Sequence, residues 1–210
     1  KTLSEGFNLV KKRPVITIPF LIASAISYFL QVISFNNAGK IDFTIVVLNL
    51  LGTVLSIFLY GLAIRVAYAA ATRKRISFEN ASQVTLERLV GLILSGILMG
   101  ALTVLGFVLL IIPGIFIAIK LAFYEFAIMI DNARIVESLK KSWKVTKNNW
   151  WRILGLMLIM GLVTVPLVIF NFAFNVPSSF FTSLMYYLLT ALISSWYTAS
   201  LTLAYLKLRK

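Results

Sequence analysis

The chain has 210 residues, of which 60% are hydrophobic and only 13% charged, and its mean hydropathy is +0.94. Soluble domains carry about 25% charged residues, so this composition excludes a water-soluble globular protein and predicts an all-α integral membrane protein. The sequence has no Cys and no His, which excludes disulfides, thiolate nucleophiles, the usual zinc sites and histidine general bases.

Apolar segments long enough to cross a bilayer recur along the whole chain. A hydrocarbon core of about 30 Å needs about 20 helical residues. We therefore predict a single membrane domain over residues 1–210 with six transmembrane helices, at about 14–34, 43–65, 89–111, 115–130, 150–170 and 180–206. Span four is short, carries charges and follows the helix-breaking Pro113 and Gly114, so a re-entrant or strongly tilted helix is the alternative there.

Basic residues gather in alternate loops, with Lys40 alone on the other side. Because Lys and Arg accumulate on the cytoplasmic side of a membrane, this asymmetry predicts that both termini are cytoplasmic. In a soluble protein, 20 basic against 7 acidic residues would suggest nucleic acid as a partner. Next to apolar spans they predict contact with anionic lipid head groups instead, and no nucleic acid partner.

Short amphipathic segments precede the outward-going spans, at about 2–12, 77–88 and 132–148. Each has an acidic residue early and basic residues later, the acidic residues being Glu5, Glu79 and Glu137. The pattern predicts three repeated units, each an interfacial helix followed by a helical hairpin. The alternative is that the basic cytoplasmic loops of any multispan protein produce this recurring charge pattern.

The third amphipathic segment carries the clearest interfacial pattern. Ile135, Leu139 and Trp143 form an apolar stripe beside a basic face, which is typical of a helix at the head-group boundary. The residues predicted to contact head groups are Lys140, Lys141, Trp143, Lys144, Lys147, Trp150, Trp151 and Arg152. They would dock anionic lipids or a partner protein, or simply anchor span five.

Glu125 in span four is the carboxylate expected deepest in the membrane, about 15 Å along the helix from Ile115. Lys120 lies five residues away, about 140° around the helix, so Tyr124 and residues of other spans are expected to satisfy Glu125. One hypothesis is that Glu125 and Lys120 line a polar pathway, and the other is a structural polar contact.

Small residues recur at four-residue spacing in two spans. They are Gly96 and Gly100 in span three, and Ala191, Ser195 and Ala199 in span six. Such faces allow helices to approach closely, within the monomer or between copies of the chain.

The sequence offers no enzyme signature. The acidic residues form none of the Asp pairs that would hold magnesium against a phosphate, and a phosphate-loop motif is absent. We therefore expect a chain that is not an enzyme and holds no cofactor or metal.

Three motifs carry a resemblance to known proteins: Ile112-Pro113-Gly114-Ile115, Glu137-Ser138-Leu139-Lys140-Lys141-Ser142-Trp143 and Asn149-Trp150-Trp151-Arg152. Over about 115–155 the chain resembles a loose group of prokaryotic membrane proteins. The group includes the membrane domain found beside some glycerophosphoryl diester phosphodiesterases. Members commonly have Ala-Leu where this chain has Ser138-Leu139. The resemblance implies membrane topology, a location in a prokaryotic cell membrane and no phosphodiesterase chemistry.

These observations favour a non-enzymatic membrane protein that acts as a scaffold, accessory subunit or lipid-interacting module. The expected partners are anionic membrane lipids, with a membrane protein or a second copy of the chain as further candidates. The alternative is a small-solute or ion transporter with a polar centre at Glu125 and Lys120.

Overall fold

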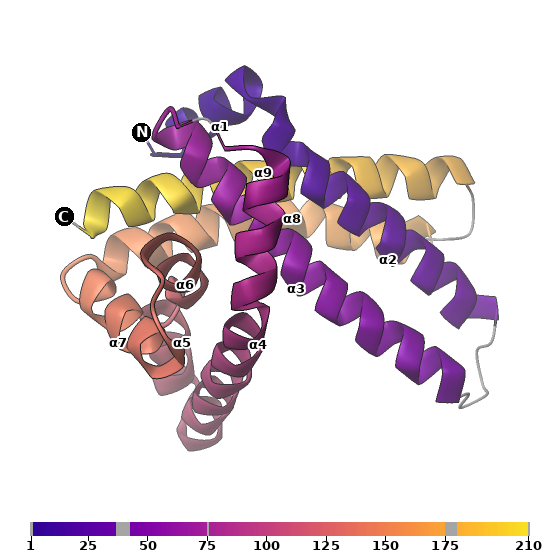
Figure 1. Cartoon of the computed structure of the whole chain (residues 1–210). Coiled ribbons are helices and arrows are strands. Elements are labelled where there is room, and N and C mark those ends of the chain that lie inside the picture. The colour runs from indigo at the N-terminus through magenta and orange to yellow at the C-terminus, as the bar shows by residue number, and fades with distance from the viewer. Residues whose placement is uncertain (1, 37–42, 75, 175–179, 210) are drawn as a thin grey trace.

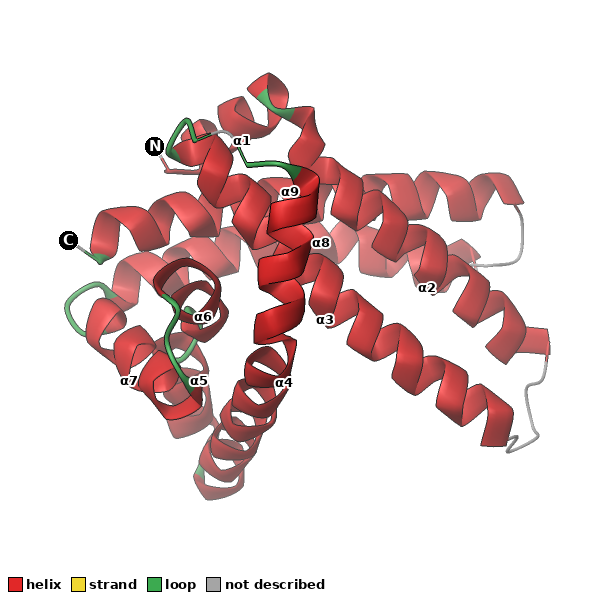
Figure 2. Cartoon of the chain, viewed as in Figure 1, coloured by secondary structure: helices red, strands yellow, loops and turns green. Residues whose placement is uncertain are grey.

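A computed structural model gives the fold and describes residues 2–36, 43–74, 76–174 and 180–209. Within these ranges the chain consists of helices joined by short turns and contains no strand (Figure 2). The predicted all-α class is therefore confirmed.

The helices follow one another with short connections. They are α1 (Thr2–Lys12), the 3-10 turn η1 (Pro14–Thr17), α2 (Ile18–Asn36), α3 (Phe43–Ala71), α4 (Phe78–Leu109), α5 (Ile111–Lys120), α6 (Tyr124–Asp131), α7 (Ile135–Thr146), α8 (Trp150–Phe174) and α9 (Phe180–Leu208).

The long helices form three hairpins, α2–α3, α4–α5 and α8–α9. Both chain ends lie on the side away from the tips of α2–α3 and α8–α9, and α4–α5 projects in a different direction from these two (Figure 1). We call the region where the three hairpins meet the hub. It contains α1, α6 and α7 together with the adjoining ends of α3, α4, α8 and α9, and α6 contacts α3, α4 and α7 there.

The largest buried core lies in the hub, and the short helix α6 is at its centre. Four consecutive residues of α6, Phe126 to Met129, are at most 2% exposed. Around them pack buried side chains of the neighbouring elements, namely Ile64, Leu92, Phe123, Ile153, Leu201 and Tyr205. Apolar burial therefore concentrates in the hub, whereas the hairpins expose apolar side chains such as Val108, Ile112, Phe172 and Phe181.

Among the described residues, five segments are long and apolar enough to cross a membrane: Pro14–Ser34, Phe43–Ala71, Phe78–Leu109, Ile111–Asp131 and Trp150–Ala173. Their length and composition fit an integral membrane protein. Helix α9 has 29 residues and is long enough, but its many hydroxyl side chains lower its hydropathy. Thr198, Ser200 and Thr202 of α9 are fully buried in the hub. Six crossings remain a prediction.

The structure differs from the predicted elements at two places. The predicted interfacial helix at about 77–88 is not separate, because it continues into span three as the single 32-residue helix α4, capped by Ser77. Conversely, span four is not one helix, since residues 121–123 form a turn between α5 and α6. Three hairpins are present, but the helix before each differs, so the repeat is not confirmed.

The small residues of span six pack inside the protein, and in span three a Cβ at Gly96 would lie 3.2 Å from the Tyr124 hydroxyl. Ala191, Ser195 and Ala199 are buried, and the hydroxyl of Ser195 accepts a hydrogen bond from Thr17 at 3.3 Å. By contrast, a Cβ at Gly100 would meet no atom within 4 Å. The close approach in α4 is at Gly106 instead, where a Cβ would lie 2.9 Å from the Cα of Gly114 in α5.

The α4–α5 contact gives a direct test of this packing. Gly106→Ala would force the two backbones apart, and overpacking of this kind costs about 1–3 kcal/mol. We expect a lower free energy of unfolding in detergent micelles, measured by titration with a denaturing detergent. The matched control is Gly100→Ala, which meets open space and is expected to leave stability unchanged or raise it, because alanine favours a helix over glycine. Equal stability of the two variants would contradict the close approach.

Candidate functional site

Two arginines from different hairpins bind the C-terminal end of α6. The Arg88 guanidinium of α4 donates to the carbonyl oxygens of Ile128 and Met129, both at 2.8 Å. Arg65 of α3 donates to the same Met129 oxygen at 3.1 Å. The C-terminal end of a helix has unpaired carbonyls and a partial negative charge. The two arginines donate hydrogen bonds to these carbonyls and balance the negative charge.

Asp131, the last residue of α6, joins this helix to α7 and α9. Its carboxylate accepts a hydrogen bond of 2.6 Å from the Tyr205 hydroxyl and lies 3.3 Å from the Lys141 ammonium. Arg209 forms a second ion pair with it. The next residue, Asn132, has a φ of 56° and ends the helix in the left-handed conformation that asparagine tolerates well.

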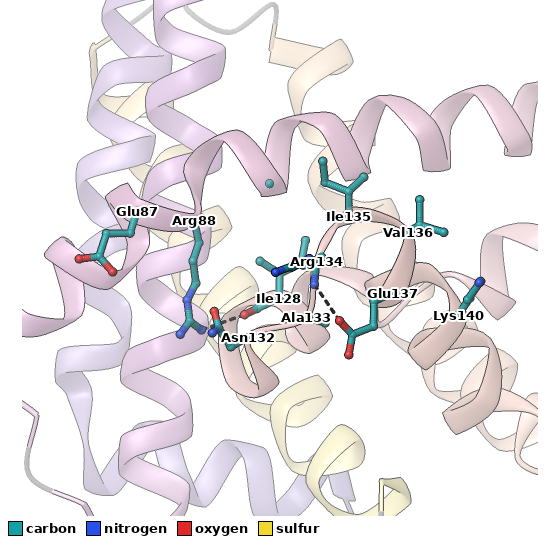
Figure 3. A pocket seen from close by; sticks show the side chains of 11 residues that line it. Glu87, Arg88, Ile128, Asn132, Ala133, Arg134, Ile135, Val136, Glu137 and Lys140 are labelled. Carbon is teal, nitrogen blue, oxygen red and sulfur yellow. Dashed lines mark hydrogen bonds between the residues drawn. The ribbon is translucent and has the colours of Figure 1, made fainter.

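A cleft of about 790 Å³ opens beside this helix end, between α4 and the start of α7. Figure 3 shows Arg88 reaching from α4 toward Ile128, with Lys140 at the opposite end of the cleft. Arg134 and Glu137 lie between them, and the Arg134 backbone N–H donates to the Glu137 carboxylate at 3.3 Å. The cleft is a wide surface groove next to the hub.

The charges that line this cleft are mixed. Arg88, Arg134 and Lys140 face two carboxylates, Glu87 and Glu137. Arg88 already donates its hydrogen bonds to the carbonyls of α6. The remaining charged residues of the cleft nearly balance one another, so the cleft has little net charge with which to select an anion. Its chemistry suits a polypeptide or another surface of mixed charge. Among the residues that the structure describes, no group of three metal-binding side chains gathers here or elsewhere.

The turn that interrupts span four is closed by hydroxyls of α7. The Ser142 hydroxyl donates to the Lys120 carbonyl at 2.8 Å and accepts the Phe123 N–H at 3.0 Å. Thr146 also donates to the Lys120 carbonyl, at 3.2 Å. Backbone groups freed by a helix break are costly in an apolar setting unless they are satisfied in this way.

The inward face of α7 is therefore more polar than its sequence pattern predicts. Ser138, Leu139, Ser142 and Thr146 are buried, whereas Trp143 is 42% exposed. Of the predicted apolar stripe, Leu139 is buried and Trp143 packs against Phe116, and the serines and threonine are buried beside it. The serines and threonine face inward because their hydroxyls bond the turn between α5 and α6 and the first turn of α7.

Lys120 and Glu125 lie on opposite sides of this turn and form no ion pair with each other. The Lys120 ammonium lies over the rings of Phe116 and Trp143, at 5.3 Å and 5.4 Å from their centres. Glu125 accepts a hydrogen bond of 2.9 Å from the Tyr124 hydroxyl, as predicted. Tyr60 of α3 and Tyr197 of α9 lie near this carboxylate. Neither Lys120 nor Glu125 lines the cleft in Figure 3.

The structure divides the predicted head-group residues into two sets. Lys141, Trp143 and Trp150 take part in internal contacts, since Lys141 pairs with Asp131 and both indoles pack against Phe116. The other set is exposed and comprises Lys140, Lys144, Lys147, Trp151 and Arg152. The lysines of this set recur at helical spacing along one side of α7, and none is paired with a carboxylate within the described residues.

A comparison with known families matches most of this region. The model of a domain of unknown function, DUF7847, matches residues 88–208. The chain belongs to the DUF7847 family. No curated protein and no solved structure matches the chain. The matched part begins at Arg88, includes α6, α7 and Asp131, and leaves out α1 to α3 with Arg65. The family description names no phosphodiesterase, so the resemblance to the phosphodiesterase-associated membrane domain stays a prediction.

The sequence patterns do not indicate that Arg65, Arg88 and Asp131 form a cluster. A signal was present for Arg65, because it interrupts the apolar α3 six residues before that helix ends. The positive-inside rule gave a sufficient explanation for Arg88 as a loop charge, and Asp131 lay just beyond the predicted span four. These residues come together only because of the turn at 121–123, and that turn contains no Gly or Pro from which it could be predicted.

Ser142 tests whether α7 holds the broken span together. Ser142→Ala leaves the buried Phe123 N–H without its acceptor, and an orphaned buried group costs about 1–3 kcal/mol. We expect a clear loss of stability in the same unfolding titration. Thr146→Ala is expected to cost less, because the Lys120 carbonyl keeps Ser142. Thr164→Ala, which removes an exposed hydroxyl of α8, is the control, and a loss as large as that of Ser142→Ala would contradict the account.

Proposed function

We propose that this chain is a non-enzymatic membrane protein of the scaffold, accessory-subunit or lipid-interacting kind, which contacts anionic lipid head groups through the exposed side of α7. The observation that carries the proposal is the unpaired row of Lys140, Lys144 and Lys147 on a helix packed against the hub. Trp151, 77% exposed, lies shortly beyond it. Cations beside an exposed indole suit the boundary between head groups and acyl chains.

The proposed topology has six crossings with both termini in the cytoplasm. It is supported by the length of α9, by the position of both chain ends on the same side in Figure 1, and by the ion pair between Glu5 of α1 and Lys207 of α9. The uncharged tip of α4–α5, around Leu110, fits the opposite side of a prokaryotic cell membrane.

A scaffold or accessory role would use the cleft between α4 and α7. Its mixed charges, with Glu87 and Glu137 near Arg134 and Lys140, would complement a membrane-protein partner or a second copy of this chain. Lys140 would belong to both contacts, because it lines the cleft and is also the first lysine of the row on α7.

Tryptophan fluorescence tests the lipid contact directly, because Trp143, Trp150 and Trp151 lie in or next to α7. In proteoliposomes, brominated phosphatidylglycerol is expected to quench more than brominated phosphatidylcholine at equal mole fraction. Lys140→Gln/Lys144→Gln/Lys147→Gln should remove this preference, since each lysine near an anionic surface contributes about 1 kcal/mol. High salt should weaken it in the wild type.

The matched control is Lys141→Gln, which removes a positive charge from the same helix but from the side facing Asp131. This variant should keep most of the preference. Equal quenching by the two lipids in the wild-type protein would contradict the proposed lipid contact.

One observation favours the rival hypothesis of a transporter. Span four is discontinuous next to Glu125, and broken helices beside ionisable groups occur at the binding sites of transporters. Our proposal predicts that proteoliposomes loaded with a pH-sensitive dye show no proton flux that depends on this carboxylate. Flux in the wild type that Glu125→Gln abolishes would instead favour the transporter, whereas equal flux in both would exclude Glu125 from any pathway.

A further inference from the structure

A second cleft, of about 590 Å³, lies at the junction of the first two hairpins. Its walls come from the segment around η1, from the last turn of α3 and from the start of α4. It is separate from the cleft in Figure 3 and shares no lining residue with it.

All the charged groups that line this second cleft are positive. They are Arg13, Arg73 and Lys74, and no carboxylate lines the cleft. Within the described residues none of the three is part of an ion pair. Three cations at one cleft with no internal counter-ion repel one another, and a bound anion would relieve this repulsion.

The local backbone holds two of these cations in a defined turn. Helix α3 ends at Ala71, and the Lys74 N–H returns to the Ala69 carbonyl at 3.0 Å. Arg73 has a φ of 55°, a left-handed conformation that normally favours glycine. The chain therefore places an arginine at a position where glycine would be the easier residue, and its side chain lines the cleft.

The remaining wall of the cleft is apolar. Val15 and Phe78 are 50% and 54% exposed there, and Val66 and Ile76 line it as well. Val15 lies at the start of the first membrane segment and Val66 toward the end of the second. A free phosphate would use only the cations, whereas a phospholipid would also cover the apolar side chains with its glycerol and acyl chains.

We infer that this cleft binds the phosphate of an anionic phospholipid, and that it prefers a head group with more than one negative charge, such as cardiolipin or phosphatidic acid. Basic pockets between transmembrane helices are suited to such head groups. The inference rests on the proposed lipid-interacting function, but it assigns a stoichiometric site to residues that lie before the matched family region.

Native mass spectrometry of the detergent-purified full chain, titrated with cardiolipin, tests the site. The variant is Arg73→Gly/Lys74→Gln. Glycine suits the φ of 55°, so the arginine can be removed without a cost to the fold. We expect one tightly bound cardiolipin in the wild type and an affinity about 25-fold lower in the variant, from about fivefold for each cation removed.

Lys12→Gln is the matched control, because Lys12 is an exposed cation next to Arg13 that does not line the cleft. It should bind cardiolipin as the wild type does. An equal loss in the control, or no loss in Arg73→Gly/Lys74→Gln, would overturn the site. Competition by inorganic phosphate at the same concentrations would also overturn it, because the ligand would then be free phosphate.

The lysine variant of α7 separates this inference from the proposed function. If Lys140→Gln/Lys144→Gln/Lys147→Gln loses the bound cardiolipin and Arg73→Gly/Lys74→Gln keeps it, the cleft assignment is wrong while the proposed lipid contact stands. If the wild type retains no anionic lipid and shows no selective quenching, both are wrong.

Discussion

The packing of α6 in the hub, where two arginines bind its last carbonyls, is the constraint on which the rest of this structure depends. An eight-residue helix is too short to be stable alone, so α6 exists because the hub encloses it. Enclosure creates a cost, since its final carbonyls lose contact with water. Arg65 and Arg88 remove that cost from two sides, and in doing so they fix α3 and α4 relative to α6. Asp131 extends the same arrangement to α7 and α9.

The position of α6 also explains why span four is broken and why α7 turns hydroxyl side chains inward. A straight span four could not place Phe126 to Met129 in the hub core and still follow α4 back from the tip at Leu110. The turn at 121–123 resolves this conflict, and the hydroxyls of α7 satisfy the backbone groups that the turn exposes. The polar side of α7 thus faces inward at its serines, which leaves its lysines toward the surroundings.

Much of the fold follows from sequence patterns, because hydropathy and charge act over whole segments. The helical class, the apolar spans and the contact between Tyr124 and Glu125 were all predictable from residue type and helical geometry. The continuity of α4 was not predictable. An amphipathic segment has the same sequence pattern whether it forms a separate helix along the membrane surface or continues straight into a span. The open space at Gly100 was not predictable for a related reason. The spacing of small residues shows only that a close approach is allowed, and the backbone contact with α5 is at Gly106. The cluster at Arg65, Arg88 and Asp131 required knowledge of the turn at 121–123.

We propose that one hub on the cytoplasmic side holds three hairpins whose tips all reach the opposite side of the membrane. The absence of native cysteine allows this to be measured with single cysteines and an impermeant thiol reagent in sealed, oriented vesicles. Substitutions at Leu110, and at Lys40 and Ser178 in the loops that the sequence predicts on the outer side, serve as tip cysteines, and Ser4 and Lys140 report the hub. The account predicts that the three tip cysteines are labelled from the outside and the two hub cysteines only from the inside. Labelling of Leu110→Cys from the same side as Lys140→Cys would contradict it.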